Sequence, residues 1–151
     1  DGAFLRRVFF DLVGTAPTQA ETAAFLADPD PAKRDRLIDR LLADPRFAAA
    51  QAVVWDQVLF GRHPGGGDAT RKRDGFKAWL AGRFADRVPF DRWVRELLLA
   101  ESPGPALYYV QYRNQPEEAA AGVGRAFLGT QLGCARCHDH PYDVWTQNDF
   151  Y

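Results

Sequence analysis

The chain of 151 residues is most informative in what it lacks. It contains no methionine, so any metal site that uses a thioether ligand is excluded. It has two cysteines, too few for a framework of several disulfides or for the four thiolates that an iron–sulfur cluster needs within one chain. It also lacks an excess of charge, with 19 basic and 20 acidic residues, which argues against a nucleic-acid or acidic-lipid partner.

Long apolar runs are absent as well. No stretch approaches the 18 or more apolar residues of a membrane span, and the opening "DGAFLRRVFFDL" is not patterned as an export signal. We therefore predict no membrane span in this chain. Because the sequence begins within an apparent helix and ends at "NDFY", an apparent first helical turn, we expect residues 1–151 to be a single domain cut from a larger multidomain protein.

What is present is helical patterning and apolar content. Hydrophobic residues make up 46% of the chain, enough for one sizeable core, and they recur at three-and-four spacing in segment after segment. This pattern predicts an all-α fold, an irregular multi-helix bundle. Helices are expected over 4–13, 19–26, 31–42, 45–59, 76–84, 90–98 and 117–129.

Several helix ends are signalled locally. Gly14 stands where a left-handed cap is needed, and Thr18 with Glu21 matches a capping box. Asp30–Pro31 and Asp44–Pro45 each place a capping carboxylate before a proline, which predicts two more helix starts. The glycine-rich stretch 61–68 predicts a mobile loop, and the aromatic stretch "LYYVQYRN" is a candidate extended segment without a partner strand.

Both cysteines and two of the three histidines lie in "QLGCARCHDHPYD". Cys134, Cys137 and His138 form the C-x-x-C-H pattern of c-type haem attachment. Two thiols at this spacing can reach the two vinyl groups on one porphyrin edge, and the adjacent histidine can then bind the iron. The pattern predicts one covalent haem c at a C-terminal haem-attachment loop.

Other cofactors can use the same residues. Zinc could take Cys134 and Cys137 with His138 or His140, although such sites usually draw ligands from a second, distant segment. A thiol pair or disulfide is a further alternative, but thioredoxin-like pairs occur in a βαβ context. An iron–sulfur cluster could form only between subunits.

The second axial ligand of the iron is not decided by the sequence. Without methionine, His/Met coordination is excluded. His140 lies too close to His138 to reach the opposite face of the same porphyrin, so a hydrogen-bonding or structural role is expected for it. His63, in the glycine-rich loop, is a candidate sixth ligand. An open sixth position is another possibility. Three tyrosines are weaker candidates for the sixth ligand: Tyr108, Tyr109 and Tyr112.

Segments along nearly the whole chain resemble the planctomycete cytochrome-like domain, a family without a characterised function. They are "LRRVFFDLVGTAPTQAETAAFLAD", "LIDRLLADPRFA", "WDQVLFG", "VPFDRWVRELL" and "FLGTQLGCARCHDHPYDVWTQNDFY". The resemblance implies a mainly helical haem-binding module of large exported multidomain proteins, at a periplasmic or cell-surface location.

By position, the resemblance assigns haem attachment to Cys134, Cys137 and His138. It matches His140, Asp143 and Asp149 without giving them a role, and Val144 stands where a basic residue is usual.

The leading hypothesis is therefore a c-type cytochrome module for extracytoplasmic electron transfer, with a redox partner protein, a neighbouring haem domain or a second copy of the chain as partner. It is expected to be an electron-transfer module more than a catalyst. Alternative hypotheses are a five-coordinate haem enzyme or sensor and a structural interaction module that holds zinc or a disulfide.

Overall fold

A computed structural model describes residues 1–61, 68–112 and 115–151. Within these residues there are helices and no strands, which confirms the all-α prediction. The elements are α1 (Gly2–Val13), α2 (Gln19–Ala27), α3 (Lys33–Leu42), α4 (Pro45–Phe60), α5 (Asp68–Ala85), α6 (Phe90–Leu99), α7 (Pro103–Tyr109), η1 (Val110–Tyr112), α8 (Pro116–Val123), η2 (Gly124–Leu128), η3 (Leu132–Arg136) and α9 (Gln147–Phe150).

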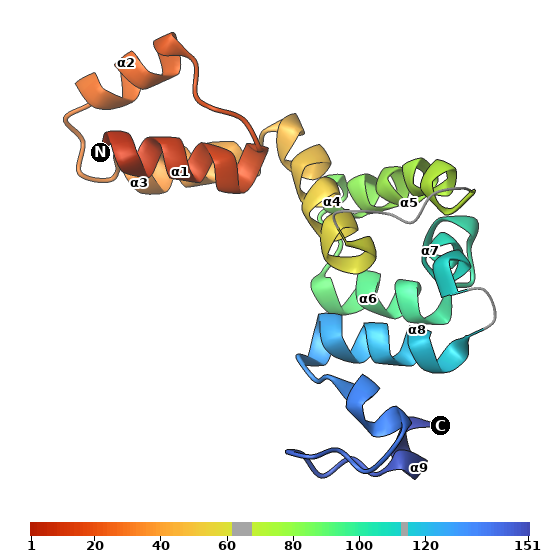
Figure 1. The fold of residues 1–151 in the computed structure, drawn as a ribbon. Helices are drawn as coiled ribbons and strands as arrows, with labels where there is room; N and C mark the ends of the chain where they lie inside the picture. Colours follow the sequence, from red (N-terminus) through yellow and green to blue (C-terminus); the bar gives the residue numbers. More distant parts are fainter. Residues whose placement is uncertain (62–67, 113–114) are drawn as a thin grey trace.

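The helices form two groups along the chain (Figure 1). α1, α2 and α3 lie together at the N-terminal end, α4 leads from them into a larger group with α5 to α8, and η3 and α9 follow at the far end. Among the described residues, no helix is both long and apolar enough to cross a membrane.

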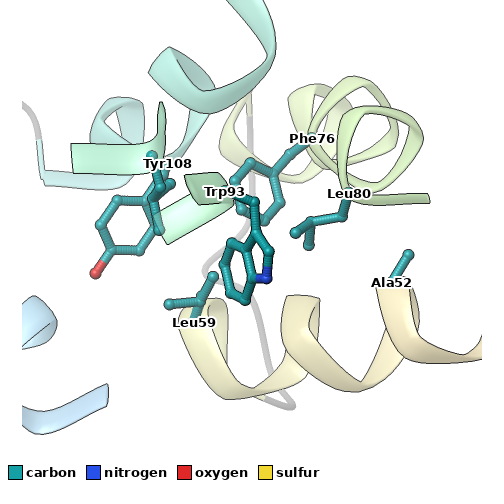
Figure 2. Packing of buried hydrophobic residues seen from close by; sticks show 7 residues of the cluster. Ala52, Leu59, Phe76, Leu80, Trp93 and Tyr108 are labelled. Atoms are coloured by element: carbon teal, nitrogen blue, oxygen red, sulfur yellow. The ribbon is translucent and has the colours of Figure 1, made fainter. Parts of the chain in front are cut away.

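The buried residues form two clusters rather than the single core that the composition suggested. The N-terminal cluster joins α1, α2 and α3 through Leu5, Phe9, Val13, Phe25, Leu37 and Leu41. The larger cluster joins α4 to α7, and Figure 2 shows the Trp93 indole surrounded by Leu59, Phe76 and Leu80. Because α4 contributes to the larger cluster while its first turn packs Phe47 on the smaller one, this helix connects the two.

Three of the predicted helix boundaries are confirmed. Gly14 takes the left-handed conformation (φ 71°) at the end of α1. Thr18 and Glu21 form a capping box at α2. Asp44 accepts the Arg46 N–H (2.9 Å) at the start of α4, with Pro45 as the first helical residue.

Two local predictions are wrong. The helix predicted from Pro31 begins at Lys33, because the Asp30 carboxylate accepts the Ala32 N–H (2.7 Å) within a preceding turn. The stretch "LYYVQYRN" is helical over its described part, ending α7 and forming η1. Burial of Tyr108 in the larger cluster supplies the reason, since tertiary packing overrides the strand propensity of an isolated aromatic segment.

Candidate functional site

The cysteine segment follows directly from α8. This helix continues into the π-helical turn η2, which ends at Gly129 in the left-handed conformation (φ 68°), and the chain then turns back into η3. η3 lies against α8 and η2. Leu132 packs against Gly124, and the Arg136 guanidinium pairs with the Glu118 carboxylate of α8. Ala135 of η3 is fully buried.

The two cysteines lie in and directly after η3. Cys134 lies in η3 and Cys137 caps it, so the predicted attachment loop is a short 3₁₀-helix with a loop after it. Both cysteines are exposed and neither is in a disulfide. They therefore offer two free thiols within one short segment.

The imidazole of His138 is oriented by its own backbone neighbour. Nδ1 lies 2.6 Å from the Asp139 carbonyl oxygen. Since a carbonyl oxygen only accepts, Nδ1 must carry the proton and donate it, which leaves the lone pair on Nε2. Metal-binding histidines commonly donate their second ring N–H in this way, and it fixes the tautomer that can bind a metal. His138 is exposed, and its Nε2 carries the lone pair.

His140 has the opposite arrangement. Its Nδ1 accepts the Tyr142 backbone N–H (3.2 Å), and its own backbone N–H donates to the Trp145 carbonyl (2.8 Å). Because Nδ1 is the acceptor, the proton of the neutral ring sits on Nε2. These contacts hold the loop after His138.

The acidic residues of the motif organise the chain around the histidines. Asp139 Oδ1 accepts the Gln147 N–H (2.9 Å), and Asp143 Oδ1 accepts the Val144 N–H (2.8 Å). Asp149 forms a capping box with Thr146 at the start of α9, and the Thr146 N–H lowers the pKa of the Asp149 carboxyl. These side chains therefore shape the loop.

A hollow of about 290 Å³ opens between α8, η2 and η3, and Cys134 is on its wall. Its other lining residues are Tyr112, Glu118, Ala121, Gly122, Arg125, Gln131, Leu132 and Gly133. No local sequence pattern pointed to Glu118 or Arg125, because they reach the motif only when η3 folds back on α8. Beside Cys134 there is thus a recess lined by both apolar and polar side chains.

The residues predicted as candidate sixth ligands lie in different parts of the chain. His63 lies outside the described residues. Tyr108 is buried in the larger cluster, and burial raises the pKa of its hydroxyl, so it stays protonated. The Tyr109 hydroxyl donates to the Leu98 carbonyl (3.4 Å). Of the three tyrosines, Tyr112 lines the hollow beside Cys134.

The apolar residues near the motif in sequence fall into two groups, one packed in the core and one exposed. Phe127 packs on Trp55 and Trp93 of the larger cluster, with ring centroids 6.0 and 6.1 Å apart, so it belongs to the core. Tyr142 (95% exposed) and Val144 (84% exposed) project from the loop. In the described segments, no three His, Cys, Asp or Glu side chains gather as they would around a bound metal ion.

Comparison with known proteins gives one match. No curated protein and no solved structure is significantly similar to the chain. The model of the PSCyt2 family, described as "Protein of unknown function (DUF1549)", matches residues 1–151. Since the match covers the whole chain, the protein belongs to the PSCyt2 family, the planctomycete cytochrome-like family that it resembles in sequence.

Proposed function

We propose that the protein is an extracytoplasmic electron-transfer module in which Cys134 and Cys137 attach one haem c and His138 binds its iron. The observation that carries this proposal is the hydrogen bond from His138 Nδ1 to the Asp139 carbonyl, which leaves the lone pair on Nε2. His138 directly follows Cys137 in the chain, and both Cys134 and Cys137 are free. The family's cytochrome-like name agrees with it. Bound at this position, haem c supplies one-electron redox chemistry.

The attachment chemistry needs only groups that the chain and the haem provide. Each thiol adds across one vinyl group: a sulfur–carbon bond forms, the thiol hydrogen passes to the other vinyl carbon, and no atom leaves. The protein therefore gains the full haem mass, about 616 Da. Bacteria carry out this attachment outside the cytoplasm, which supports a periplasmic or cell-surface location.

The position of the motif suits exchange of electrons with a partner. Cys134, Cys137 and His138 are exposed. The blue C-terminal segment that contains them, between η2 and α9, lies at the end of the molecule away from α1 to α3 (Figure 1). A haem held there would be close to the surface, where a redox partner protein, a neighbouring haem domain or a second copy of the chain can approach it.

The test is the intact mass of protein made in cells with c-type haem maturation machinery, measured after denaturation together with the pyridine haemochrome spectrum. The parent should gain one haem, and the double variant Cys134→Ser/Cys137→Ser should gain none. Each single variant should release more haem into acid–acetone than the parent does. If the parent keeps the mass of the protein without haem, and Cys134 and Cys137 hold zinc or form a disulfide, the proposal is overturned.

A second measurement separates the electron carrier from a haem enzyme or sensor. Two axial ligands leave no position for a small molecule, whereas five-coordinate iron binds carbon monoxide when reduced. We expect the spectrum of the reduced holoprotein to stay unchanged under carbon monoxide. A shifted Soret band would favour the enzyme or sensor.

A further inference from the structure

We infer that the hollow between α8, η2 and η3 binds a small organic carboxylate, held by the Arg125 guanidinium and the Tyr112 hydroxyl. Both residues line this hollow. The site is distinct from the proposed haem attachment, because Tyr112 belongs to η1 and Arg125 to η2, outside the C-x-x-C-H motif.

The Tyr112 hydroxyl has a hydrogen to donate into the hollow. It lies 2.9 Å from the Tyr108 hydroxyl, and by distance alone either oxygen can be the donor. Tyr108 is buried, and within residues 1–61, 68–112 and 115–151 its hydroxyl has no other hydrogen-bond partner. Because buried donors are nearly always hydrogen-bonded, Tyr108 donates to Tyr112. The hydrogen of the Tyr112 hydroxyl therefore remains available to a ligand.

Arg125 supplies a positive charge at the same place. It follows Gly122 by three residues, and the missing side chain of Gly122 is what leaves room for the Tyr112 hydroxyl. Burial raises the pKa of the Tyr108 hydroxyl and the Arg125 charge acts in the opposite direction, which places this cation near the hydroxyl pair. Among the described residues, Arg125 takes part in no ion pair. A cation and a hydroxyl donor therefore converge on one recess.

The other lining residues favour an organic carboxylate. Glu118 also lines the wall, but Arg136 of η3 pairs with it and offsets its charge. Ala121 and Leu132 add apolar surface. A guanidinium binds a carboxylate through two parallel hydrogen bonds, and small-molecule sites combine apolar walls with a few polar groups. Such sites commonly measure roughly 300 to 1,000 Å³, so a hollow of about 290 Å³ takes a small carboxylate with a short apolar body.

The probe is benzoate, titrated onto the full chain and followed by NMR, with benzamide as an uncharged control of the same shape. We expect the parent to bind benzoate about tenfold more tightly than benzamide, because hydrogen bonds to a charged partner are the strong ones. Arg125→Gln should abolish this preference. Arg7→Gln removes a cation from α1, at the other end of the molecule (Figure 1), and should retain it.

Two tyrosine variants test the direction of the hydrogen bond. Tyr112→Phe removes the donor and should weaken benzoate binding roughly fivefold to tenfold. Tyr108→Phe removes the same bond between the hydroxyls but leaves the Tyr112 hydrogen in place, so its affinity should stay within about twofold of the parent. A cooperative urea transition shows that each variant is folded.

The double variant Cys134→Ser/Cys137→Ser separates this site from the haem. It cannot attach haem, and it should still bind benzoate with the parent's preference. If the parent gains no haem mass while benzoate binds as described, the proposed function falls and the carboxylate site stands. Three results each overturn the site: equal binding of benzoate and benzamide by the parent, an unchanged preference in Arg125→Gln, or equal benzoate affinities of Tyr112→Phe and Tyr108→Phe.

Discussion

The hydroxyl oxygens of Tyr108 and Tyr112 lie 2.9 Å apart, and this hydrogen bond connects the larger buried cluster to the hollow beside Cys134. Gly122 of α8 makes room for the pair, because a Cβ at this position would overlap the Tyr112 hydroxyl. The absence of a side chain at Gly122 is therefore what allows α8 to pack on the two tyrosines.

We predict that Gly122→Ala destabilises the fold. The added methyl must displace the tyrosine pair, and overpacking of this kind costs about 1–3 kcal/mol. The free energy of unfolding in urea would show the loss. Gly133→Ala is the matched control, because the space at Gly133 is open and its effect should stay within about 0.5 kcal/mol of the parent. Equal stability of the two variants would contradict the packing described here.

We predict that the buried ion pair between Asp56 and Arg73 stabilises the larger cluster. Arg73 Nη2 lies 2.5 Å from Asp56 Oδ2, both residues are buried, and the guanidinium also lies over the Phe60 ring. Asp56→Ala leaves a buried, unpaired cation, so we expect it to lower the free energy of unfolding by about 3–5 kcal/mol. Chemical denaturation measures this loss.

The double variant Asp56→Leu/Arg73→Met is the control for this prediction. It removes both charges and retains apolar volume, and replacements of buried ion pairs by apolar residues are often neutral. We expect its stability to lie well above that of Asp56→Ala. A double variant as unstable as the single one would show that packing, not the unpaired charge, dominates.

Much of the helical pattern could be predicted because its determinants are local. Gly14, the Thr18–Glu21 capping box and Asp44–Pro45 each act within a few residues of a helix end, so the sequence shows both partners. Asp30–Pro31 contains the same residue types but serves the turn before α3 instead, since its carboxylate caps Ala32 and pairs with Arg36 on α3. The residue types predict a cap, while the exact start depends on tertiary contacts.

The candidate site was predictable only in part for the same reason. The spacing of Cys134, Cys137 and His138 is visible in the sequence, but the tautomer of His138 depends on its Asp139 contact. The hollow depends on η3 folding back toward α8, which brings Gly133 close to residues such as Arg125. Such long-range contacts leave no periodic signal, and neither does the division of the apolar residues into two clusters.

We predict that acid destabilises the start of α4, the helix that connects the two clusters, by protonating Asp44. Hydrogen bonds from the Arg46 side chain and backbone lower the pKa of the Asp44 carboxyl from 3.8 to about 2. A carboxyl with a lower pKa in the folded state stabilises the fold above its unfolded pKa, and this contribution is lost as the pH falls through the folded pKa. We therefore expect the start of α4 to lose stability between about pH 4 and pH 2.

Asp44→Asn is the matched variant for this pH dependence. Asparagine still caps the helix through its side-chain oxygen but does not titrate. Urea unfolding at pH 5 and pH 3 should show a smaller loss of stability on acidification for Asp44→Asn than for the parent. An identical loss in both proteins would show that other carboxyls account for the acid sensitivity.

The two histidines of the motif should respond differently to substitution in the holoprotein. His138→Ala removes the proposed iron ligand, so we expect a shifted Soret band that added imidazole partly restores. His140→Asn keeps a side-chain oxygen that can accept the Tyr142 N–H, so its spectrum and its stability should both remain those of the parent. Absorption spectra with and without imidazole measure the difference.

His140→Ala completes the comparison, because it removes the acceptor of the Tyr142 N–H without touching His138. We expect an unchanged Soret band together with a loss of about 1 kcal/mol in stability, the usual contribution of one hydrogen bond. If His140→Ala shifted the Soret band and His138→Ala did not, the two histidines would have exchanged roles. The lone pair on His138 Nε2 would then have no function in binding iron, and the hydrogen bond to Asp139 would be only a feature of the turn.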